Sequence, residues 1–293
     1  MAHESLRRGR EISPAVYNRR MSFADQPVPP DPPTDKPSPA APAPPFSAPP
    51  AAPLAPPWSL GRSLLIFGLL FAAILLCQSA AMLVAQLWPA MRRMTIAELG
   101  ADPFVVIGGM TAAYLWTLWQ LRRMVCSATE KRFAEAIHWR WPRYWPLYAA
   151  GGIVMSGAMQ WLGNALPHPQ ELPIDRYFAS TTASWAMAFF GTLVAPLAEE
   201  LLFRGMLYPV LRRKWGVAAA ILLTTAGFAL IHFDQLGGAW GPILVIVLVG
   251  LILTVVRQLT DSVGSSFAVH LFYNGTIFAL AALSSHGFMD VGR

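Results

Sequence analysis

Charged side chains are scarce in this sequence. Only 13% of the 293 residues are Asp, Glu, Lys or Arg, whereas 55% are hydrophobic. Since soluble domains carry about 25% charged residues, this composition excludes an ordinary soluble fold of this length. Cysteine is nearly absent as well: Cys77 and Cys126 stand far apart and form no CxxC pair. We therefore expect both thiols to be reduced and assign them no redox role.

Several local patterns are missing too. No segment alternates apolar and polar residues as a half-buried strand would, and no internal repeat is visible. The sequence has neither a GxSxG nucleophile elbow nor an HExxH zinc motif. An all-α fold is predicted, and a serine nucleophile or a zinc site on one helix has no local support.

Proline, by contrast, is concentrated near the N-terminus. Fifteen of the 26 prolines lie between Pro27 and Pro57, after a short basic stretch. Such a segment buries too little apolar surface to offset its ordering entropy. We predict a disordered, Pro-rich cytoplasmic tail over residues 1–57 and a transmembrane helical domain over 58–293. No apolar run near the start suggests a secretory signal.

From Leu64 onward the sequence is a series of apolar stretches. Each is close to the ~20 residues that a helix needs to cross a bilayer. The predicted helices cover 64–87, 104–121, 145–163, 183–211, 217–233, 241–257 and 265–283. We expect a polytopic membrane helix bundle of about seven transmembrane helices, with six to eight as the range. The fourth stretch would be ~43 Å long, so it should tilt, kink at Pro196 or extend beyond the bilayer.

The basic residues are distributed unevenly between these stretches. With the N-terminus inside, 17 of the 22 Lys and Arg residues lie on the cytoplasmic side, four lie outside, and Arg204 lies within the fourth stretch. This bias predicts a cytoplasmic N-terminus. Because orientation accounts for the basic excess, no nucleic-acid partner is expected. Arg outnumbers Lys 19 to 3, a bias common in GC-rich bacteria, so we expect a bacterial plasma (inner) membrane.

Ionisable residues inside these stretches are the candidate functional groups, because each costs ~2.5 kcal/mol or more within a membrane. Glu200 and Arg204 are four residues apart and share a helix face, which predicts an ion pair. Glu199 is rotated from that pair by about 100° and is left free for chemistry. The complete set is Glu199, Glu200, Arg204, Phe228, His232, His270 and Asn274.

These groups lie at comparable depths. Glu199, His232 and His270 are about 20, 24 and 14 Å from the inferred cytoplasmic edge at helical rise, so one mid-membrane site is geometrically permitted. Glu199 with a nearby imidazole can activate water, and Asn274 with one imidazole can stabilise an oxyanion. Either His alone could instead serve a helix–helix hydrogen bond.

A metal mechanism stays open from the residues alone. Glu199, His232 and His270 together would make a site of two imidazoles and one carboxylate, suited to a divalent metal such as zinc. The two His come from different helices, so spacing gives no local evidence of a metal. The leading mechanism requires no cofactor.

The three motifs, EExxxR at Glu199–Arg204, FxxxH at Phe228–His232 and HxxxN at His270–Asn274, resemble those of the CAAX prenyl endopeptidase and bacteriocin-processing family (CPBP, or Abi). They occur in the family's order over about residues 183–283. The resemblance implies a helical intramembrane endopeptidase in which Glu199 acts as base with His232. It further implies that His270 and Asn274 form the oxyanion hole and that Glu200 and Arg204 support the site. The family has been described as both metal-dependent and glutamate-dependent.

Other functions remain open at this point. A proton-coupled transporter would use Glu199, Glu200, His232 and His270 as a relay, although no inverted repeat supports it. A catalytically idle scaffold or immunity protein would keep the same pocket. For the peptidase, the expected partners are the lipid bilayer and a hydrophobic or lipidated peptide substrate, whose prenylation the sequence does not decide.

Overall fold

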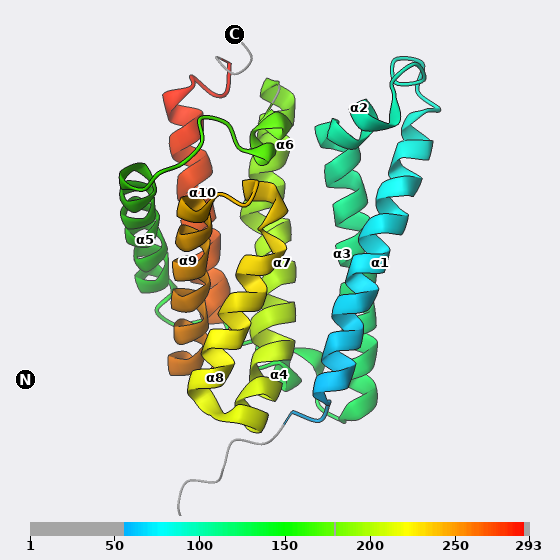
Figure 1. The fold of residues 1–293 in the computed structure, drawn as a ribbon. Helices are drawn as coiled ribbons and strands as arrows, with labels where there is room; N and C mark the ends of the chain where they lie inside the picture. Colours follow the sequence, from blue (N-terminus) through cyan, green and yellow to red (C-terminus); the bar gives the residue numbers. More distant parts are fainter. Residues whose placement is uncertain (1–55, 179, 290–293) are drawn as a thin grey trace, which may run out of the picture. The chain divides into compact units, whose positions relative to one another are not determined.

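The computed structural model describes residues 56–178 and 180–289, which form helices joined by loops (Figure 1). No strand occurs among these residues, so the predicted all-α fold is confirmed. Almost all of the predicted Pro-rich tail, residues 1–57, lies outside the described residues, and its disorder and cytoplasmic location stay predictions.

The seven predicted stretches lie in six helical segments, because the fourth and fifth stretches belong to one continuous run. The first three are α1 (Leu60–Ala85), α3 (Pro103–Ala128) and α5 (Trp145–Ala165). A continuous helical run then covers α6 (Thr181–Phe189), η2 (Phe190–Val194), α7 (Ala195–Glu199), η3 (Glu200–Leu207) and α8 (Tyr208–Ile231), and α9 (Trp240–Thr260) and α10 (Val263–Ser284) complete the bundle. The short elements are α2 (Ile96–Ala101), α4 (Phe133–Ala136), η1 (Pro173–Phe178) and η4 (Asp234–Leu236).

Gly216 divides the long helical run into the two separate helices that the sequence predicts. Its φ of 81° and ψ of 176° are strongly non-helical. Only glycine adopts this region of backbone space readily, because it lacks Cβ. The chain reverses at this point, and α8 returns along the bundle (Figure 1).

Five helical segments of the described chain are long and apolar enough to cross a membrane: α1, α3, Thr181–Ile231, α9 and α10. The segment Thr181–Ile231 has 51 residues and contains the reversal at Gly216. Helix α5 has 21 residues but is less apolar and is not in this set. The described part is therefore a bundle with several membrane-spanning helices, and the count of seven stays a prediction.

The helix that carries the EExxxR motif contains two π-helical segments, each followed by a proline. Ala195 N–H bonds the carbonyl of Phe190, five residues back, at the end of η2. Tyr208 N–H bonds the carbonyl of Phe203 in the same way at the end of η3. Pro196 follows Ala195, and Pro209 follows Tyr208. A proline has no N–H, so neither residue can bond the next carbonyl of the helix, five residues back.

Two carbonyls are therefore left without an in-helix donor, those of Gly191 and Arg204. Other helices supply the missing donors. Asn274 Nδ2 of α10 donates to Gly191 O at 2.7 Å, and Arg257 Nε of α9 donates to Arg204 O at 3.2 Å. The helix passes the predicted kink position, Pro196, by way of a π turn, and its proline residues create attachment points for α9 and α10.

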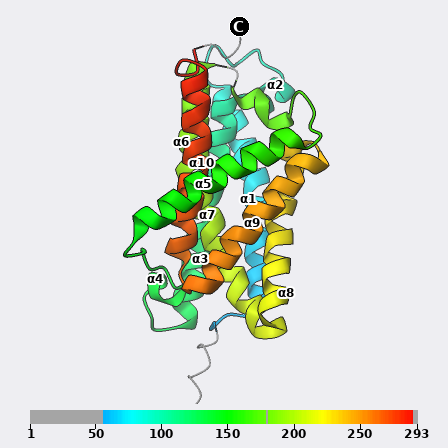
Figure 2. The same ribbon diagram turned by 90° about the vertical axis from the view of Figure 1, so that its left-hand side faces the viewer.

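Helix α5 packs obliquely across α10 (Figure 2). Gly152 of α5 makes this close approach, because a Cβ at this position would overlap the carbonyl of Val269 and the amide of Tyr273. On the other side of the bundle, α1 packs along α3. Trp58 Nε1, just before α1, donates to the carbonyl of Met206 at 3.0 Å and ties this pair to the motif helix.

The basic connections gather at one end of the bundle. The start of α1, the end of α3, α4, the reversal at Gly216 and the α9–α10 turn all lie at the lower end in Figure 1. We call this the basic end. The α1–α2 loop and the α5–α6 connection lie at the opposite end. This arrangement matches the segments that the sequence assigned to each side, and the side of the membrane itself stays a prediction.

Candidate active site

Glu199 and Glu200 lie at the junction of α7 and η3 and are both buried. Four residues make slightly more than one α turn and slightly less than one π turn, so Arg204 stays on the face of Glu200 in this geometry. Arg204 Nη1 lies 3.1 Å from Glu200 Oε1, and both side chains are fully buried. The predicted ion pair is present and is more deeply buried than the sequence suggested.

Glu200 is the centre of a polar network that joins the motif helix to α10. The Ser266 hydroxyl donates to Glu200 Oε2 at 2.6 Å, and His270 Nδ1 lies 3.0 Å from Oε1. Three side chains thus surround one carboxylate. Because a buried charge is costly without such partners, this network fixes the position of α10 against the motif helix.

Arg204 is held from two further directions. Its Nη2 donates to the carbonyl of Gly250 in α9 at 3.0 Å. Its guanidinium lies 4.4 Å from the ring centroid of Phe228, a cation–π contact with α8. The Phe228 ring also lies 4.8 Å from His232 and 5.9 Å from His270. Phe228, the first residue of the FxxxH motif, therefore packs between the ion pair and the two imidazoles.

Glu199 faces both imidazoles. Its Oε1 lies 3.9 Å from His232 Nε2, and its Oε2 lies 3.8 Å from His270 Nε2. These separations are too long for direct hydrogen bonds, but one water at ~2.8 Å from both partners fits beside each pair. The structure brings the three predicted groups together from α7, the end of α8 and α10.

The opposite ring nitrogens fix the orientation of each imidazole. His232 Nδ1 lies 2.8 Å from the carbonyl of Phe228, which only accepts hydrogen bonds, so Nδ1 carries the proton. His270 Nδ1 points at the Glu200 carboxylate and is likewise the donor. Both Nε2 atoms are thereby directed at Glu199, and a neutral imidazole offers a lone pair there.

A cavity of about 230 Å³ connects these residues to Asn274. Its polar lining includes Glu199, His232, His270 and Asn274, and its remaining lining is mainly aromatic and aliphatic. One N–H of the Asn274 amide bonds Gly191 O, so the second N–H stays available to a bound group. All four residues named as catalytic candidates therefore share one partly apolar chamber.

The donor types in this chamber suit zinc, since two imidazoles and a carboxylate are common zinc ligands and each Nδ1 has an acceptor of its own. The geometry does not match this chemistry. Within residues 56–178 and 180–289, no group of three or more His, Cys, Asp or Glu residues is placed to hold a metal ion. We therefore derive no reaction step through a metal.

A second polar cluster lies at the α9–α10 turn. Arg257, whose Nε holds Arg204 O, places Nη1 2.9 Å from Asp261 Oδ1. His138 Nδ1 lies 2.8 Å from Asp261 Oδ2, and Arg140 donates to the Asp261 carbonyl at 2.7 Å. Partial burial raises the pKa of the Asp261 carboxyl, but Arg257 and His138 outweigh that effect and hold it below its usual value. This cluster links the loop before α5 to the motif helix.

Sequence reasoning missed several supporting residues. Ser266 precedes His270 by one turn, as His270 precedes Asn274, so the i, i+4, i+8 stripe in α10 could have identified it. Arg257 and His138 were not among the candidate residues. Arg257 precedes Asp261 by four residues, a spacing that could have suggested their ion pair. Its bond to Arg204 and the contact of His138 with Asp261 join distant segments and have no local signal.

One family model matches the chain: type II CAAX prenyl endopeptidase Rce1-like, over residues 181–276. The matched region begins at α6, contains all three motifs and ends within α10, and it covers about a third of the 293 residues. No curated protein and no solved structure matches the chain significantly. The family match confirms the resemblance that the three motifs indicated.

Proposed function

Residues 181–276 are a CAAX prenyl endopeptidase-like region, and on this premise we propose that the protein hydrolyses a peptide bond of a membrane-associated substrate in the Glu199 cavity. The observation that carries the proposal is the convergence of one carboxylate and two oriented imidazoles beside a free amide donor. Such a set provides a base for water and donors for an oxyanion.

Glu199 is the general base in this proposal. A water bound between Glu199 and His232 donates one hydrogen bond to the carboxylate and another to the His232 Nε2 lone pair. As the water oxygen bonds the scissile carbonyl carbon, its proton passes to Glu199. Glu199 then delivers this proton to the leaving amine when the C–N bond breaks, which yields one carboxylic acid and one amine.

Asn274 and His270 bind the developing oxyanion. Asn274 supplies the second N–H of its side-chain amide, the one that is not bonded to the Gly191 carbonyl. Two carboxylates, Glu199 and Glu200, face His270, whereas one guanidinium faces Glu200. In the proposed role, His270 Nε2, which faces Glu199 in the cavity, provides an N–H that donates to the oxyanion.

The substrate proposed is a hydrophobic or lipid-modified peptide. The cavity lining supports this class, because residues such as Tyr114, Phe190 and Phe278 surround the polar groups. Whether the substrate carries a prenyl group is decided by comparing peptides of identical sequence with and without farnesyl.

The test is cleavage of those peptides by the full-length protein in nanodiscs. Glu199→Gln keeps the shape of the side chain but removes the base, so we expect kcat to fall by about 10²–10⁴-fold. Glu130→Gln, at an exposed carboxylate of the basic end, is the matched control and should cut as wild type does. Equal rates for wild type and Glu199→Gln would refute the proposal.

A chelator arm addresses the metal question separately. Glutamate-dependent hydrolysis predicts the same rate before and after incubation with EDTA. Loss of cleavage in EDTA that zinc restores would retain the peptidase function but replace its mechanism with a metal-dependent one.

The comparison of the farnesylated and unmodified peptides tests the substrate class. Cleavage of both peptides at the same rate would show that the substrate does not need a prenyl group.

A further inference from the structure

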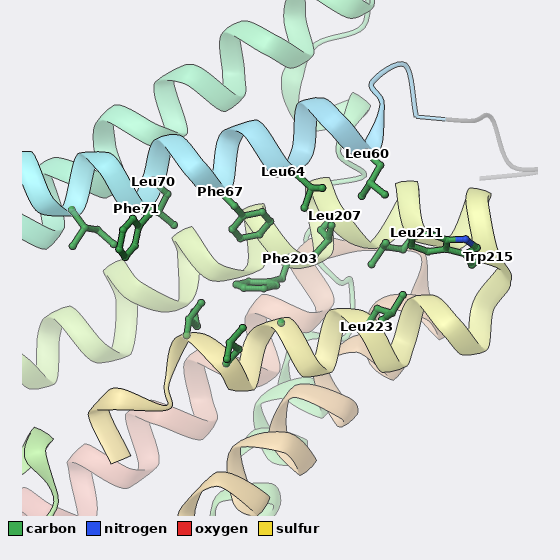
Figure 3. Close-up of a pocket in the computed structure, with 14 residues that line it drawn as sticks. Leu60, Leu64, Phe67, Leu70, Phe71, Phe203, Leu207, Leu211, Trp215 and Leu223 are labelled. Carbon is green, nitrogen blue, oxygen red and sulfur yellow. The ribbon is translucent and has the colours of Figure 1, made fainter. Parts of the chain in front are cut away.

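A second cavity, separate from the catalytic chamber, opens along the side of α1. It has a volume of about 560 Å³ and an almost wholly apolar lining. One wall is α1, with Leu64 and Phe67; the second is the motif helix from Phe203 to Trp215; the third is the returning part of α8 (Figure 3). We call this cavity the lateral groove.

Two aromatic side chains form the floor of the lateral groove. The rings of Phe67 and Phe203 lie 5.1 Å apart, and Phe203 packs edge-on against Phe228 at 5.7 Å. Phe203 and Phe228 thus separate the groove from the catalytic chamber. Gly227 keeps the floor open, because a Cβ there would lie 3.4 Å from Phe203.

The groove has the depth of one membrane leaflet. Its lining on α1 runs from Leu60 to Ile74, which is about 21 Å at helical rise. One leaflet is about 20 Å thick with its headgroup region, of which about 15 Å is hydrocarbon. The groove begins at the basic end, where Leu60 and Trp215 both line it, and extends along α1 as far as Ile74 (Figure 3).

Basic residues flank the open end on the wall that the motif helix forms. Arg212, Arg213 and Lys214 immediately precede Trp215, whereas Arg62 of α1 lines a different pocket, toward α3. Lys214 Nζ lies 4.7 Å from the ring centroid of Trp215, which lines the groove. An apolar channel of leaflet depth with cations at its interfacial end matches one kind of molecule, a lipid with an anionic headgroup.

We propose that the lateral groove is a binding site for an anionic phospholipid. One acyl chain lies in the groove on Phe67 and Phe203, and the phosphate lies beside Arg212 and Lys214, near Trp215. This lipid is a bound component of the protein and not its substrate. The site is independent of the peptidase function, because none of the polar groups around Glu199 takes part.

The test measures lipid retained by the full-length protein in native mass spectrometry. The protein is exchanged into mixtures of phosphatidylglycerol and phosphatidylcholine with identical acyl chains. We expect one retained phosphatidylglycerol, preferred by about fivefold for each basic residue that contacts the phosphate. The double variant Arg212→Gln/Lys214→Gln should lose this preference, whereas Arg62→Gln, on the α3-facing side of α1, should keep it.

A bulky substitution tests the groove itself. Leu64→Trp fills it and should lower phosphatidylglycerol retention by about fivefold or more. Leu76→Trp is the matched control, since Leu76 is an exposed residue of α1 outside the groove. If Leu64→Trp fails to fold, Leu223→Trp blocks the groove from the opposite wall.

Three results would overturn the proposal. Wild type could retain both lipids equally, which would indicate ordinary bulk lipid. Leu64→Trp could retain as much phosphatidylglycerol as Leu76→Trp. Finally, glycerol phosphate without acyl chains could displace the lipid, which would place the anion at a site independent of the groove. Peptide cleavage does not enter this readout, so each proposal can fail without the other.

Discussion

At the scale of single residues, Arg204 is the most constrained charge in the described chain. It is fully buried, pairs with Glu200, donates to Gly250 and lies on the Phe228 ring. Its own carbonyl accepts from Arg257. Removal of one member of a buried pair leaves the other charge uncompensated, which is far costlier than removal of both.

We therefore predict different outcomes for single and double variants of this pair. Arg204→Met should destabilise the folded protein by about 3–5 kcal/mol, because Glu200 then stays buried without its cation. Adding Glu200→Gln to Arg204→Met should recover a substantial part of that loss. Thermal unfolding of the variants in detergent measures both effects, and an identical Tm for the single and double variants would contradict this account.

The sequence allowed part of this network to be predicted. Glu200 and Arg204 are one turn apart, so their pairing followed from helical geometry. His270 is 70 residues from Glu200, and only its similar depth in the bilayer suggested proximity. The ring nitrogen that faces each partner depends on the rotation of α10 about its axis, which no local pattern specifies.

At the scale of helices, the two π segments connect the motif helix to its neighbours. Beside each π segment, one backbone carbonyl has no N–H partner in the helix, because the residue that would donate is a proline. A side chain of another helix donates to it instead, Asn274 to Gly191 O and Arg257 to Arg204 O. Asn274 is held in the catalytic chamber by this means. The placement of the proposed oxyanion donor thus depends on the missing N–H of Pro196.

Pro196→Ala tests this dependence. The new N–H can satisfy Gly191 O and release Asn274, so we expect a Tm equal to or above that of wild type together with slower cleavage. The loss in kcat should be about tenfold or more, up to the ~10²–10³ typical of losing an oxyanion donor.

Pro209→Ala is the matched control, because its carbonyl partner, Arg204 O, binds Arg257 rather than a group in the chamber. It should affect kcat less than Pro196→Ala does. Unchanged cleavage by Pro196→Ala would show that Asn274 does not need the Gly191 carbonyl to keep its position.

Helix boundaries were largely predictable, and the π segments were not. The basic run Arg212–Lys214 and Gly216 separated the fourth and fifth stretches, as the structure shows. The fourth stretch was expected to tilt, to kink at Pro196 or to extend beyond the bilayer. The structure adds a π turn just before Pro196, and Asn274 of α10 bonds the free carbonyl of Gly191. That partner is known only from the tertiary structure.

At the scale of the whole bundle, the basic connections lie at one end (Figure 1), and the cavity beside Glu199 is lined by residues of the motif helix, α8, α9 and α10. The sequence predicted this segregation from the Lys and Arg counts alone. The lateral groove could not be predicted from the sequence. Its shape depends on the packing of α1 against the motif helix, through contacts such as those of Trp58 with Met206 and of Phe67 with Phe203.

Membrane orientation can be measured with the native thiol at the basic end. In a Cys77→Ser background, exposed Cys126 should react with a membrane-impermeant maleimide only after the cells are opened. An Ala90→Cys/Cys126→Ser variant places the thiol in the loop after α1 and should react in intact cells. The reverse pattern would place the basic end outside and overturn the predicted topology.

Helix α5 contributes no residue to the chemistry, yet its glycine contact limits how α10 can move. With the Gly152 backbone seated against Val269 and Tyr273, α10 cannot slide along its axis without a collision. A slip of one turn, about 5.4 Å, would exchange the positions of Ser266, His270 and Asn274, which are spaced one turn apart. Gly152 therefore restricts axial movement of α10 and keeps Ser266, His270 and Asn274 opposite their partners in the motif helix. In this way α5, which carries no motif, supports the geometry of the site.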